Sequence, residues 1–433
     1  MNISLDLSNK SFAIYGLGST GQSIIKYFKK LGIKNYVIWD DNKALKSYWR
    51  LNKKKENLFF KFLNFADYII VSPGINLKKN RYRNVFLKNK YKIITDLDLF
   101  YMTNPKIKSI VVTGTNGKST TCKIIEHILK KNGFQVKLGG NIGNPILDLK
   151  VKKNSTIIIE ASSFQLFYSK FIKPNYAIIL NISNDHLDWH GSMNNYILSK
   201  MKIFSLQNKN DFAFINNKNL IKKFRSNKYL SKLKIVKLKI YEQIKNSIKN
   251  DYLSLEANVE NMSFVYALSK NLKINKNLFI KSCQSFKGLE HRHEIFYKKK
   301  NKVFINDSKA TTFEATKFAL KNNKNIFWIM GGQPKIGEKF ELKKIKKNII
   351  KTYIIGKHMK IFVRHLKNNV KFQLCKTLTN ATYLAINDSK NIINDRSTIL
   401  LSPSSASYDQ FRNFEERGNQ FKKLVKNYLK KNH

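Results

Sequence analysis

The sequence is poor in cysteine and lacks long apolar runs. Its three cysteines, Cys122, Cys283 and Cys375, are odd in number and widely spaced among 433 residues. This pattern argues against a disulfide framework and for a reducing compartment. No apolar run approaches the roughly 20 residues that a membrane-spanning helix needs. The first ten residues also lack the basic and then apolar pattern of a secretory signal, so we expect a cytoplasmic protein with no membrane partner.

Acidic residues and arginines are also scarce. The chain has 28 Asp and Glu against 81 Lys and Arg, a formal net charge of +53, and only nine of the basic residues are arginine. Proteins that bind nucleic acid usually concentrate arginine where phosphates or bases are contacted. Here the lysines are spread over nearly every segment. We therefore favour a solvated surface set by composition over a nucleic-acid groove, although such a surface would still attract acidic substrates.

The chain is too long for a single core and reads as three α/β units. Short apolar runs alternate with amphipathic stretches from residue 11 onward, which is typical of parallel sheets. We predict three domains, covering residues 1–105, 106–288 and 289–433. The expected folds are a Rossmann-like first domain, a central domain like a P-loop ATPase and a second Rossmann-like domain at the carboxyl end.

A shortened phosphate-binding loop follows the apolar run Ile110–Val112. Its pattern is Gly114-x-x-Gly117-Lys118-Ser119, with Val112 where the usual motif has its first glycine. Glycines at the start of a helix let backbone N–H groups face phosphate oxygens. The lysine would neutralise the phosphates, and the hydroxyl of Ser119 or Thr120 would ligate Mg²⁺. The alternative is a plain strand-to-helix turn that happens to carry a lysine.

Glu160 ends a second apolar run, where a carboxylate is costly unless a metal or a cation meets it. It could hold magnesium, or it could be a salt-bridged strand end. After the next run, the segment NDHLDWHG brings His186 between acids, a mixture that suits Mg²⁺ or Mn²⁺ better than structural zinc. In the same segment we favour His190 as a capping or surface group. Lys200, fourteen residues past His186, would ordinarily be a solvent-facing helix residue.

The amino-terminal segment YGLGSTG matches the dinucleotide-binding fingerprint. Gly16, Gly18 and Gly21 have the required spacing, and Asp40 follows the next predicted strand. A hydride-transfer enzyme is the alternative that this spacing raises. Such an enzyme has no need for a second phosphate loop, however. Two nucleotide-type loops on one chain suggest two nucleotides, of which one reacts and the other is used only for binding the substrate.

Taken in order, the motifs resemble those of the Mur ligases, the ATP-dependent amide-forming enzymes of peptidoglycan precursor synthesis. The blocks that carry the resemblance extend from about residue 11 to 420 and are VVTGTNGKSTT, GGNIGNP, EASSFQL, NDHLDWHG, GLEHRHE, NDSKAT and LLSPSSASYDQFRNFEERG. In this family the compact TGTNGKS loop is usual, so the missing glycine is expected. The resemblance implies that D-glutamate is joined to UDP-N-acetylmuramoyl-L-alanine through an acyl phosphate, with ATP and two Mg²⁺ ions.

The resemblance also assigns the site residues. The catalytic set is Lys118, Glu160, His186 and Lys200. The metal ligands would be Ser119, Glu160, His186 and Lys200, the last as a CO₂-derived carbamate. The ATP-binding set is Gly114, Thr115, Asn116, Gly117, Lys118, Ser119, Thr120, Asn258, Arg292, Asp307 and Lys309. The UDP-substrate set is Gly18, Ser19, Thr20, Gly21, Asp40, Ser72, Gly74, Asn141 and His186. The D-glutamate set is Thr311, Lys335, Ser407 and Phe414. A monomer without nucleic acid is expected.

Some positions depart from the family pattern, and other activities have to be weighed. Leu255 and Ala257 differ beside Asn258, Gln333 stands where Asp is common, and Thr312 stands where Asn is usual. A sibling ligase for a diamino acid would carry an Asp-Asn-Pro-Arg motif, which the sequence does not contain. A folylpolyglutamate synthase would lack the first domain. A non-catalytic nucleotide- or nucleic-acid-binding protein would explain the charge but would leave Glu160, His186, Lys200 and Asp307 without a role.

Overall fold

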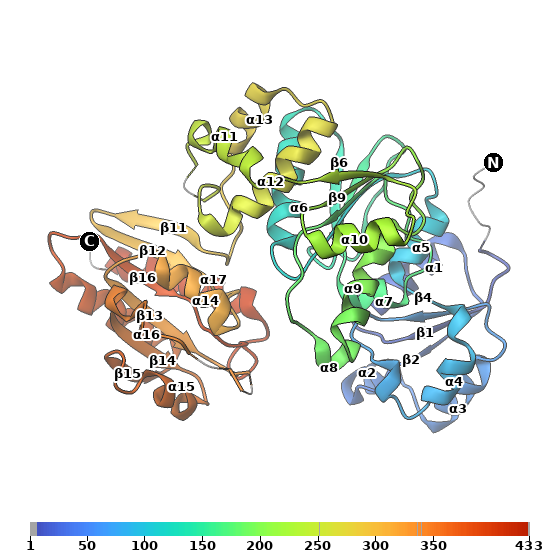
Figure 1. The fold of residues 1–433 in the computed structure, drawn as a ribbon. Helices are drawn as coiled ribbons and strands as arrows, with labels where there is room; N and C mark the ends of the chain where they lie inside the picture. The colour runs from blue at the N-terminus through green and yellow to red at the C-terminus, as the bar shows by residue number, and fades with distance from the viewer. Residues whose placement is uncertain (1–6, 251, 336, 339, 432–433) are drawn as a thin grey trace. The chain divides into compact units, whose positions relative to one another are not determined.

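The computed structural model describes residues 7–250, 252–335, 337–338 and 340–431. Contacts divide the chain into two compact units, unit 1 from Met1 to Phe286 and unit 2 from Lys287 to His433. Within the described residues there are three sheets, two in unit 1 and one in unit 2, each with helices packed around it (Figure 1). The predicted α/β class is confirmed. The residue boundaries proposed for three domains stay a prediction.

The first sheet of unit 1 is four-stranded and entirely parallel, in the order β2-β1-β3-β4. Its strands are short and apolar, as expected where both faces are covered. They are β1 (Phe12–Tyr15), β2 (Tyr36–Trp39), β3 (Tyr68–Val71) and β4 (Ile93–Ile94). The helices of this region are α1 (Ser19–Leu31), α2 (Lys43–Tyr48), α3 (Lys53–Phe62), α4 (Arg83–Lys88) and α5 (Asp96–Thr103), with short 3₁₀ turns η1 (Leu77–Lys79) and η2 (Lys90–Lys92).

The second sheet of unit 1 is six-stranded and parallel, in the order β10-β9-β8-β5-β7-β6. Its strands are β5 (Lys108–Thr113), β6 (Val136–Gly140), β7 (Thr156–Glu160), β8 (Tyr176–Ile179), β9 (Phe212–Ile215) and β10 (Lys232–Ile235). Its helices are α6 (Lys118–Lys131), α7 (Ser163–Tyr168), α8 (Leu187–His190), α9 (Met193–Met201), α10 (Lys218–Ser226), α11 (Lys239–Ile248), α12 (Glu256–Asn271) and α13 (Lys276–Gln284), with 3₁₀ turns η3 (Ile146–Asp148) and η4 (Lys202–Phe204).

One apolar core joins the two sheets of unit 1. Ile14 and Phe28 of the first region belong to the same buried cluster as Val111 and Ile159 of the second. Within the second sheet, β5 lies between β8 and β7, so the segments after these three strands leave the same edge. In open parallel sheets, ligands bind outside the carboxyl ends of the strands. The fold therefore gathers the loops that carry the predicted phosphate and metal residues.

Unit 2 is built on a six-stranded sheet in the order β11-β12-β16-β13-β14-β15, with only β11 antiparallel to its neighbour. Buried clusters cover both of its faces. The strands are β11 (Glu294–Lys299), β12 (Lys302–Asn306), β13 (Ile326–Gly331), β14 (Ile349–Ile355), β15 (Phe372–Lys376) and β16 (Ser397–Leu401). The helices are α14 (Phe313–Lys321), α15 (Met359–Leu366), α16 (Leu378–Asp388) and α17 (Phe414–Lys431), with 3₁₀ turns η5 (Lys346–Asn348) and η6 (Ser389–Asn391).

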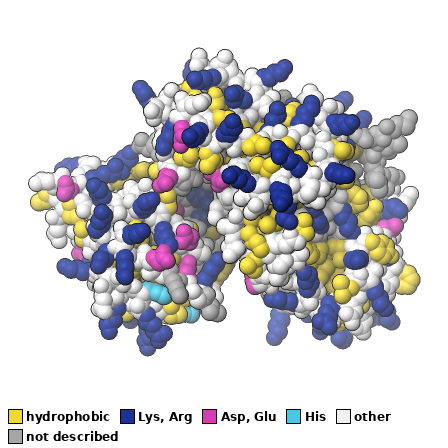
Figure 2. Space-filling view, viewed as in Figure 1, with side chains coloured by type: hydrophobic (Ala, Val, Ile, Leu, Met, Phe, Trp, Pro, Cys, Tyr) yellow, Lys and Arg dark blue, Asp and Glu magenta, His cyan; other side chains and the backbone are white. Residues whose placement is uncertain are grey.

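The surface follows the composition. In the described part of the face that Figure 2 shows, Lys and Arg side chains are scattered over both units and do not form one continuous stripe. A search of the described residues finds no helix with the length and apolar character that crossing a membrane requires.

Candidate active site

The phosphate-type loop lies between β5 and α6, where the sequence predicts it. Gly114 and Gly117 have positive φ values of 153° and 81°. A Cβ atom at Gly117 would lie 2.1 Å from Oδ1 of Asn261, so this position has room only for glycine. Ser119 and Thr120 stand in the first turn of α6 and are each 5% exposed. The loop is therefore a tight turn held against α12, and it opens directly on a helix amino terminus.

Lys118 folds back over its own loop. Its Nζ donates to the carbonyl oxygens of Gly114 (2.9 Å) and Thr115 (2.8 Å). The ammonium is thereby held above the turn, where a phosphate bound to the loop amides would meet it. The phosphate-binding role of Lys118 stays a prediction.

The segment after β8 fixes the loop from its other side. Asn181 accepts hydrogen bonds from the amides of Thr115 (2.9 Å, at the carbonyl) and Asn116 (2.8 Å, at Oδ1). Its own Nδ2 donates to Oε2 of Glu260 on α12. The sequence interpretation did not single out Asn181 or Glu260. An asparagine two residues after a buried strand is the signal that could have suggested Asn181.

Asn258, predicted on the ATP side, is connected to the same loop. It is buried in the first turn of α12, and its Oδ1 accepts a hydrogen bond from Nδ2 of Asn261 at 3.1 Å. Asn261 in turn lies against Gly117 and accepts a hydrogen bond from Thr121 at 3.2 Å. The structure thus brings Asn258 to the phosphate loop through one intervening side chain.

Glu160 ends β7 beside β5 and is 2% exposed. Its Oε1 accepts a hydrogen bond from Nδ2 of Asn141 at 2.9 Å. Its Oε2 is buried and has no hydrogen-bond partner among the described residues. A carboxylate oxygen left bare in this way is costly unless a cation reaches it. The alternative of a salt-bridged strand end does not describe this side chain, because no ion pair of Glu160 is found among the described residues.

Lys200 is buried, not solvent-facing as its place on a helix would suggest. It is 1% exposed, and its Nζ donates to the carbonyl oxygen of Gly114 at 2.8 Å. The ammonium also lies 4.6 Å from the ring centroid of Tyr196. Burial, and secondly the positive charge of Lys118, lower the pKa of Lys200 well below its ordinary value. Lys118 and Lys200 thus converge on one carbonyl oxygen.

The two histidines after β8 differ in their environments. His186 is half-exposed in a left-handed conformation, with Nε2 3.3 Å from Oδ2 of Asp185. His190, favoured as a capping or surface group, is fully buried; that prediction is wrong. It forms a 3.0 Å hydrogen bond with Ser163, and burial is the main cause that lowers its pKa to about 4. The aromatic rings around it, which include Phe164 and Trp189, explain why it lies inside.

A single cavity of about 110 Å³ joins most of these groups. Its lining residues are Lys118, Asn141, Ser162, Ser163, Phe164, Asp185, His186, Tyr196 and Lys200. Glu160 accepts a hydrogen bond from Asn141, which lines this cavity. Within the described residues, no group of three or more His, Cys, Asp or Glu side chains could hold a metal unaided. A cation at Glu160 would therefore complete its shell with substrate oxygens and water, as Mg²⁺ commonly does.

The predicted UDP-binding loop follows β1 in the first region of unit 1. Gly18 precedes α1, Ser19 and Thr20 form its first turn, and a Cβ at Gly21 would lie 2.0 Å from the carbonyl oxygen of Gly16. Asp40 shapes this loop, because its two oxygens accept hydrogen bonds from the amides of Leu17 (2.6 Å) and Asn42 (2.7 Å).

The segment after β3 meets the same loop. Ser72 donates from its hydroxyl to the carbonyl oxygen of Gly16 at 2.9 Å, and Gly74 lies exposed two residues further on. The residues predicted to hold UDP therefore surround one strand-end loop, with Asn141 and His186 in the cavity of the second region.

The remaining predicted residues lie in unit 2, after the strands β12, β13 and β16 or, for Arg292, just before the antiparallel strand β11. Asp307 follows β12 and accepts hydrogen bonds from Ser402 (2.7 Å) and from the amide of His293 (3.0 Å). Burial raises the pKa of Asp307 to about 7. Lys309 lies with Nζ 4.1 Å from the ring centroid of Phe414, the first residue of α17. Arg292 is half-buried just before β11.

Two segments of unit 2 are paired at these strand ends. Gln333 and Ala406 exchange backbone hydrogen bonds of 2.8 and 3.0 Å. This pairing connects the segment of Lys335, which is exposed, with that of Ser407, which is 3% exposed. Thr311 is half-buried just before α14. The structure thus collects the four predicted D-glutamate residues on the segments that leave one edge of the sheet.

Arg417 is a further residue of this edge that the sequence interpretation missed. It is 1% exposed, with Nε donating to the hydroxyl of Ser308 (3.0 Å) and Nη2 to the carbonyl oxygens of Ser308 (2.8 Å) and Ser405 (3.1 Å). Burial lowers its pKa to about 10. Arg417 ties the segments of Lys309 and Ser407 together. Arginine is rare in this chain, so its presence inside the last motif is the sequence feature that could have pointed to Arg417.

Replacing Arg417 with methionine is expected to loosen these segments. Three buried acceptors would lose their donors, which should lower the free energy of unfolding of unit 2 by about 3 kcal/mol. Hydrogen exchange of peptides from β12, β13 and β16 measures the loss. Arg412→Met, at an exposed arginine five residues earlier, should leave the exchange unchanged. Equal exchange in both variants would contradict the role given to Arg417.

Comparisons with known proteins identify the family. A family model described as the Mur ligase middle domain matches residues 112–281, and one described as Mur ligase MurD-like, N-terminal domain, matches residues 10–94. The chain is similar to a UDP-N-acetylmuramoylalanine–D-glutamate ligase of Rickettsia felis, with 35% identity over 97% of this chain and 98% of that protein. Proteins of the same name from Wolbachia of Brugia malayi and from Francisella tularensis are 35% and 34% identical, covering 95% and 94% of their own lengths.

Solved structures show the same fold. The UDP-N-acetylmuramate–alanine ligase MurC of Thermotoga maritima matches 98% of this chain and all of its own, with a TM-score of 0.56 and 17% identity. The MurF ligase of Thermotoga maritima, solved in complex with ADP, matches 88% of this chain and 94% of its own, with a TM-score of 0.55 and 14% identity. With relatives of this identity over nearly its whole length, the chain belongs to the Mur ligase family.

Proposed function

We propose that the chain is an ATP-dependent ligase that joins the amine of D-glutamate to the carboxylate of UDP-N-acetylmuramoyl-L-alanine. The observation that carries this proposal is the cavity in which Lys118, Asn141, His186 and Lys200 meet beside the bare oxygen of Glu160. The names of the relatives that align over nearly their whole lengths support the choice of amino acid. A dehydrogenase would leave the loop at Gly114–Ser119 without a use.

The first step is phosphoryl transfer. An oxygen of the substrate carboxylate attacks the γ-phosphorus of ATP, the bond to the bridging oxygen breaks, and ADP leaves from the acyl phosphate. Both reactants are anions, so the main task is to position them and to neutralise charge. Nζ of Lys118 is held by the carbonyl oxygens of Gly114 and Thr115, so that it lies at the loop, where it would neutralise phosphate oxygens. The amino terminus of α6 adds to the attraction.

Glu160 and Ser119 fit a magnesium ion. The bare Oε2 of Glu160 is a hard, buried oxygen at the edge of the sheet, and Ser119 stands in the first turn of the neighbouring helix. When bound, Mg²⁺ would neutralise negative charge on the phosphate oxygens. Asn141 holds the other carboxylate oxygen and so fixes the direction in which Oε2 points.

We further propose that Lys200 carries a carbamate. Its lowered pKa leaves a larger share of the amine neutral, and only a neutral amine can attack the carbon of CO₂. The ammonium first loses one proton to become the neutral amine, the N–C bond then forms, and a second proton leaves the nitrogen, so that a cation has become a carbamate anion. That change would convert two converging ammonium groups into a pair of opposite charges. With His186 in the same cavity, the carbamate would serve the second magnesium ion.

The second step is displacement of phosphate by the amine. The neutral amine of D-glutamate attacks the carbonyl carbon of the acyl phosphate, a tetrahedral intermediate forms, and inorganic phosphate leaves as the nitrogen loses a proton. We assign recognition of D-glutamate to Thr311, Lys335, Ser407 and Phe414 of unit 2. Gln333, a departure from the family pattern, uses its backbone in the pairing with Ala406, so its side chain is not needed there.

Phosphate release tests the assignment. With UDP-N-acetylmuramoyl-L-alanine, Mg²⁺ and ATP, the protein should release phosphate at least about 100-fold faster with D-glutamate than with L-glutamate or meso-diaminopimelate. Mass spectrometry of the nucleotide product identifies the amino acid added. A preference for either competitor would show that the proposed amino-acid substrate is wrong, whereas membership of the Mur ligase family would still hold. Action in the cytoplasm as a monomer, without nucleic acid or membrane, stays a prediction from the sequence.

A further inference from the structure

Unit 1 contains a second and larger cavity that the proposed reaction does not use. It has a volume of about 780 Å³ and is lined from two sides. One wall comes from residues 77–93, which include η1, α4 and η2 of the first region. The other comes from residues 167–170 at the end of α7 and from Lys202 in η4. This volume is in the range of sites that hold small molecules.

The body of this cavity is apolar. Leu77, Phe86 and Ile93 are buried in its first wall, and the rings of Phe167 and Tyr168 form the second. Two further lining side chains, Leu87 and Tyr91, are 61% and 70% exposed, although both are large and hydrophobic. Exposed apolar groups next to an apolar cavity are typical of a binding site.

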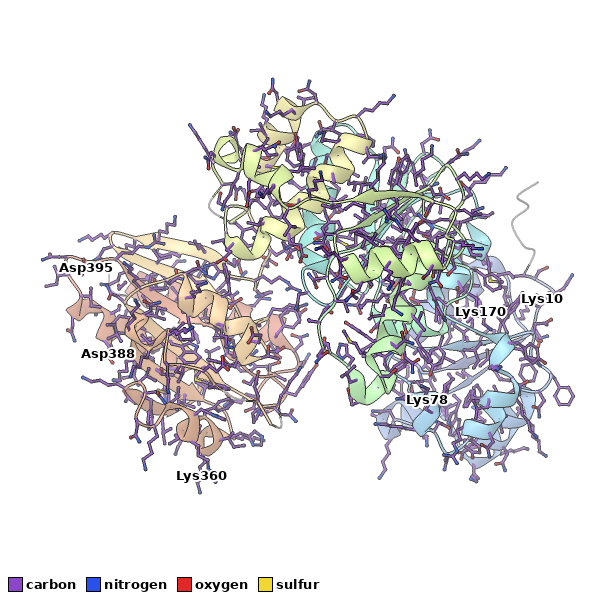
Figure 3. The ribbon with its side chains drawn as sticks, viewed as in Figure 1. Lys10, Lys78, Lys170, Lys360, Asp388 and Asp395 are labelled. Atoms are coloured by element: carbon purple, nitrogen blue, oxygen red, sulfur yellow. The ribbon has the colours of Figure 1, made fainter. Side chains whose placement is uncertain are left out.

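The charged groups of the lining are all positive. They are Lys78, Arg83, Lys90, Lys170 and Lys202, and no Asp or Glu is present among the described residues that line the cavity. Figure 3 labels Lys78 and Lys170, which come from the two opposite walls. The Nζ atoms of Lys78 and Lys202 lie 5.3 and 5.8 Å from the ring centroid of Phe167. An anion entering this space would meet cations from both walls.

Two of these lysines are held in place by backbone carbonyl groups. Nζ of Lys170 donates to the carbonyl oxygens of Lys90 (2.9 Å) and Tyr91 (2.6 Å), and Lys202 donates to that of Ser169 (3.3 Å). Burial lowers the pKa of both lysines.

The nearby acid does not neutralise these lysines directly. Asp98 accepts hydrogen bonds from the backbone amides of Lys170 (2.8 Å) and Phe171 (2.7 Å), and also from that of Thr95. Fixed cations in an apolar wall are the complement of a ligand that carries one anionic group on an apolar body.

We propose that this cavity binds a soluble amphipathic anion, a small molecule with an apolar chain or ring system and one carboxylate, sulfonate or phosphate group. The UDP-substrate is a poor match, because its polar surface is large and none of the residues assigned to it lines this cavity. The ligand would insert its apolar part between Phe86 and Phe167 and place its acid near Lys78 and Lys170.

Octanoate and 1-octanol are the probes, because they share an apolar chain and differ in charge. Isothermal titration of the full chain should give a dissociation constant at least about fivefold lower for octanoate. Lys78→Glu should raise the dissociation constant of octanoate by about fivefold or more and change that of 1-octanol by less than about twofold. The control is Lys79→Glu, at the neighbouring exposed lysine of η1 that does not line the cavity. It should leave both constants nearly unchanged.

A large side chain placed in the cavity tests whether the probes bind there. Leu87→Trp, at an exposed lining residue, should weaken both probes by about tenfold or more, whereas Leu58→Trp on α3, also exposed but outside the lining, should not. Equal binding of octanoate and 1-octanol to the unaltered protein would overturn the proposal. So would equal effects of Lys78→Glu and Lys79→Glu, which would assign binding to the general positive field, or unchanged binding in Leu87→Trp.

Discussion

Replacing Glu160 with glutamine is expected to lower kcat about 1,000-fold, on the order of 4 kcal/mol of transition-state stabilisation. The change keeps the size of the side chain and can keep the hydrogen bond with Asn141, but it removes the negative charge from the buried position of Oε2. Phosphate release under saturating substrates measures the loss. Titration of Mn²⁺ by electron paramagnetic resonance, with a non-hydrolysable ATP analogue present, should show weaker binding of the ion in Glu160→Gln.

Glu126→Gln is the matched control for this variant. Glu126 lies on α6, and its partly buried carboxylate pairs with the exposed lysines Lys123 (3.0 Å) and Lys130 (2.7 Å). Ion pairs with exposed lysines contribute little, so activity and Mn²⁺ binding should be unchanged within about twofold. If Glu160→Gln kept full activity, Oε2 would not face the metal, and the assignment of both Glu160 and Ser119 would fail.

Local sequence signals predicted the elements that carry the chemistry. The run Ile110–Val112 followed by two glycines and a lysine indicates a strand, a tight turn and a helix start, and the structure has all three in that order. Glu160 was found because an acid at the end of a strand is unusual. Each of these two patterns spans only a few consecutive residues, so the local backbone conformation alone fixes how those residues are placed.

Local sequence patterns could not predict the contacts between segments that are distant in the chain. The polarity of His190 predicts a surface group, yet four aromatic side chains from α7, α8 and α9 enclose it, namely Phe164, Phe167, Trp189 and Tyr196. Arg417 finds its acceptors about ten and about a hundred residues away, in Ser405 and Ser308. The burial of Lys200 followed only from resemblance, because a lysine on a helix usually faces water.

Replacing Lys200 with alanine is expected to lower kcat by about 1,000-fold, and small carboxylic acids should restore part of the activity. In the unaltered protein the carbamate would supply an anion beside Lys118. Alanine removes it and leaves space in a buried position. Acetate or propionate can then enter and provide the missing carboxylate. Phosphate release as a function of acetate concentration measures the rescue.

Lys200→Met separates the lost anion from lost packing. Methionine fills most of the space, so this variant should be as inactive as Lys200→Ala but should gain nothing from acetate. Nuclear magnetic resonance with carbon-13 bicarbonate should show a carbamate carbon in the unaltered protein and in neither variant. Burial lowers the pKa of Lys200, so the amine is neutral above that value and protonated below it. The carbamate, and with it the activity, should therefore decline as the pH falls, whereas acetate-rescued Lys200→Ala should lack this decline. Full activity in Lys200→Met would contradict the carbamate, because no anion could then form at that position.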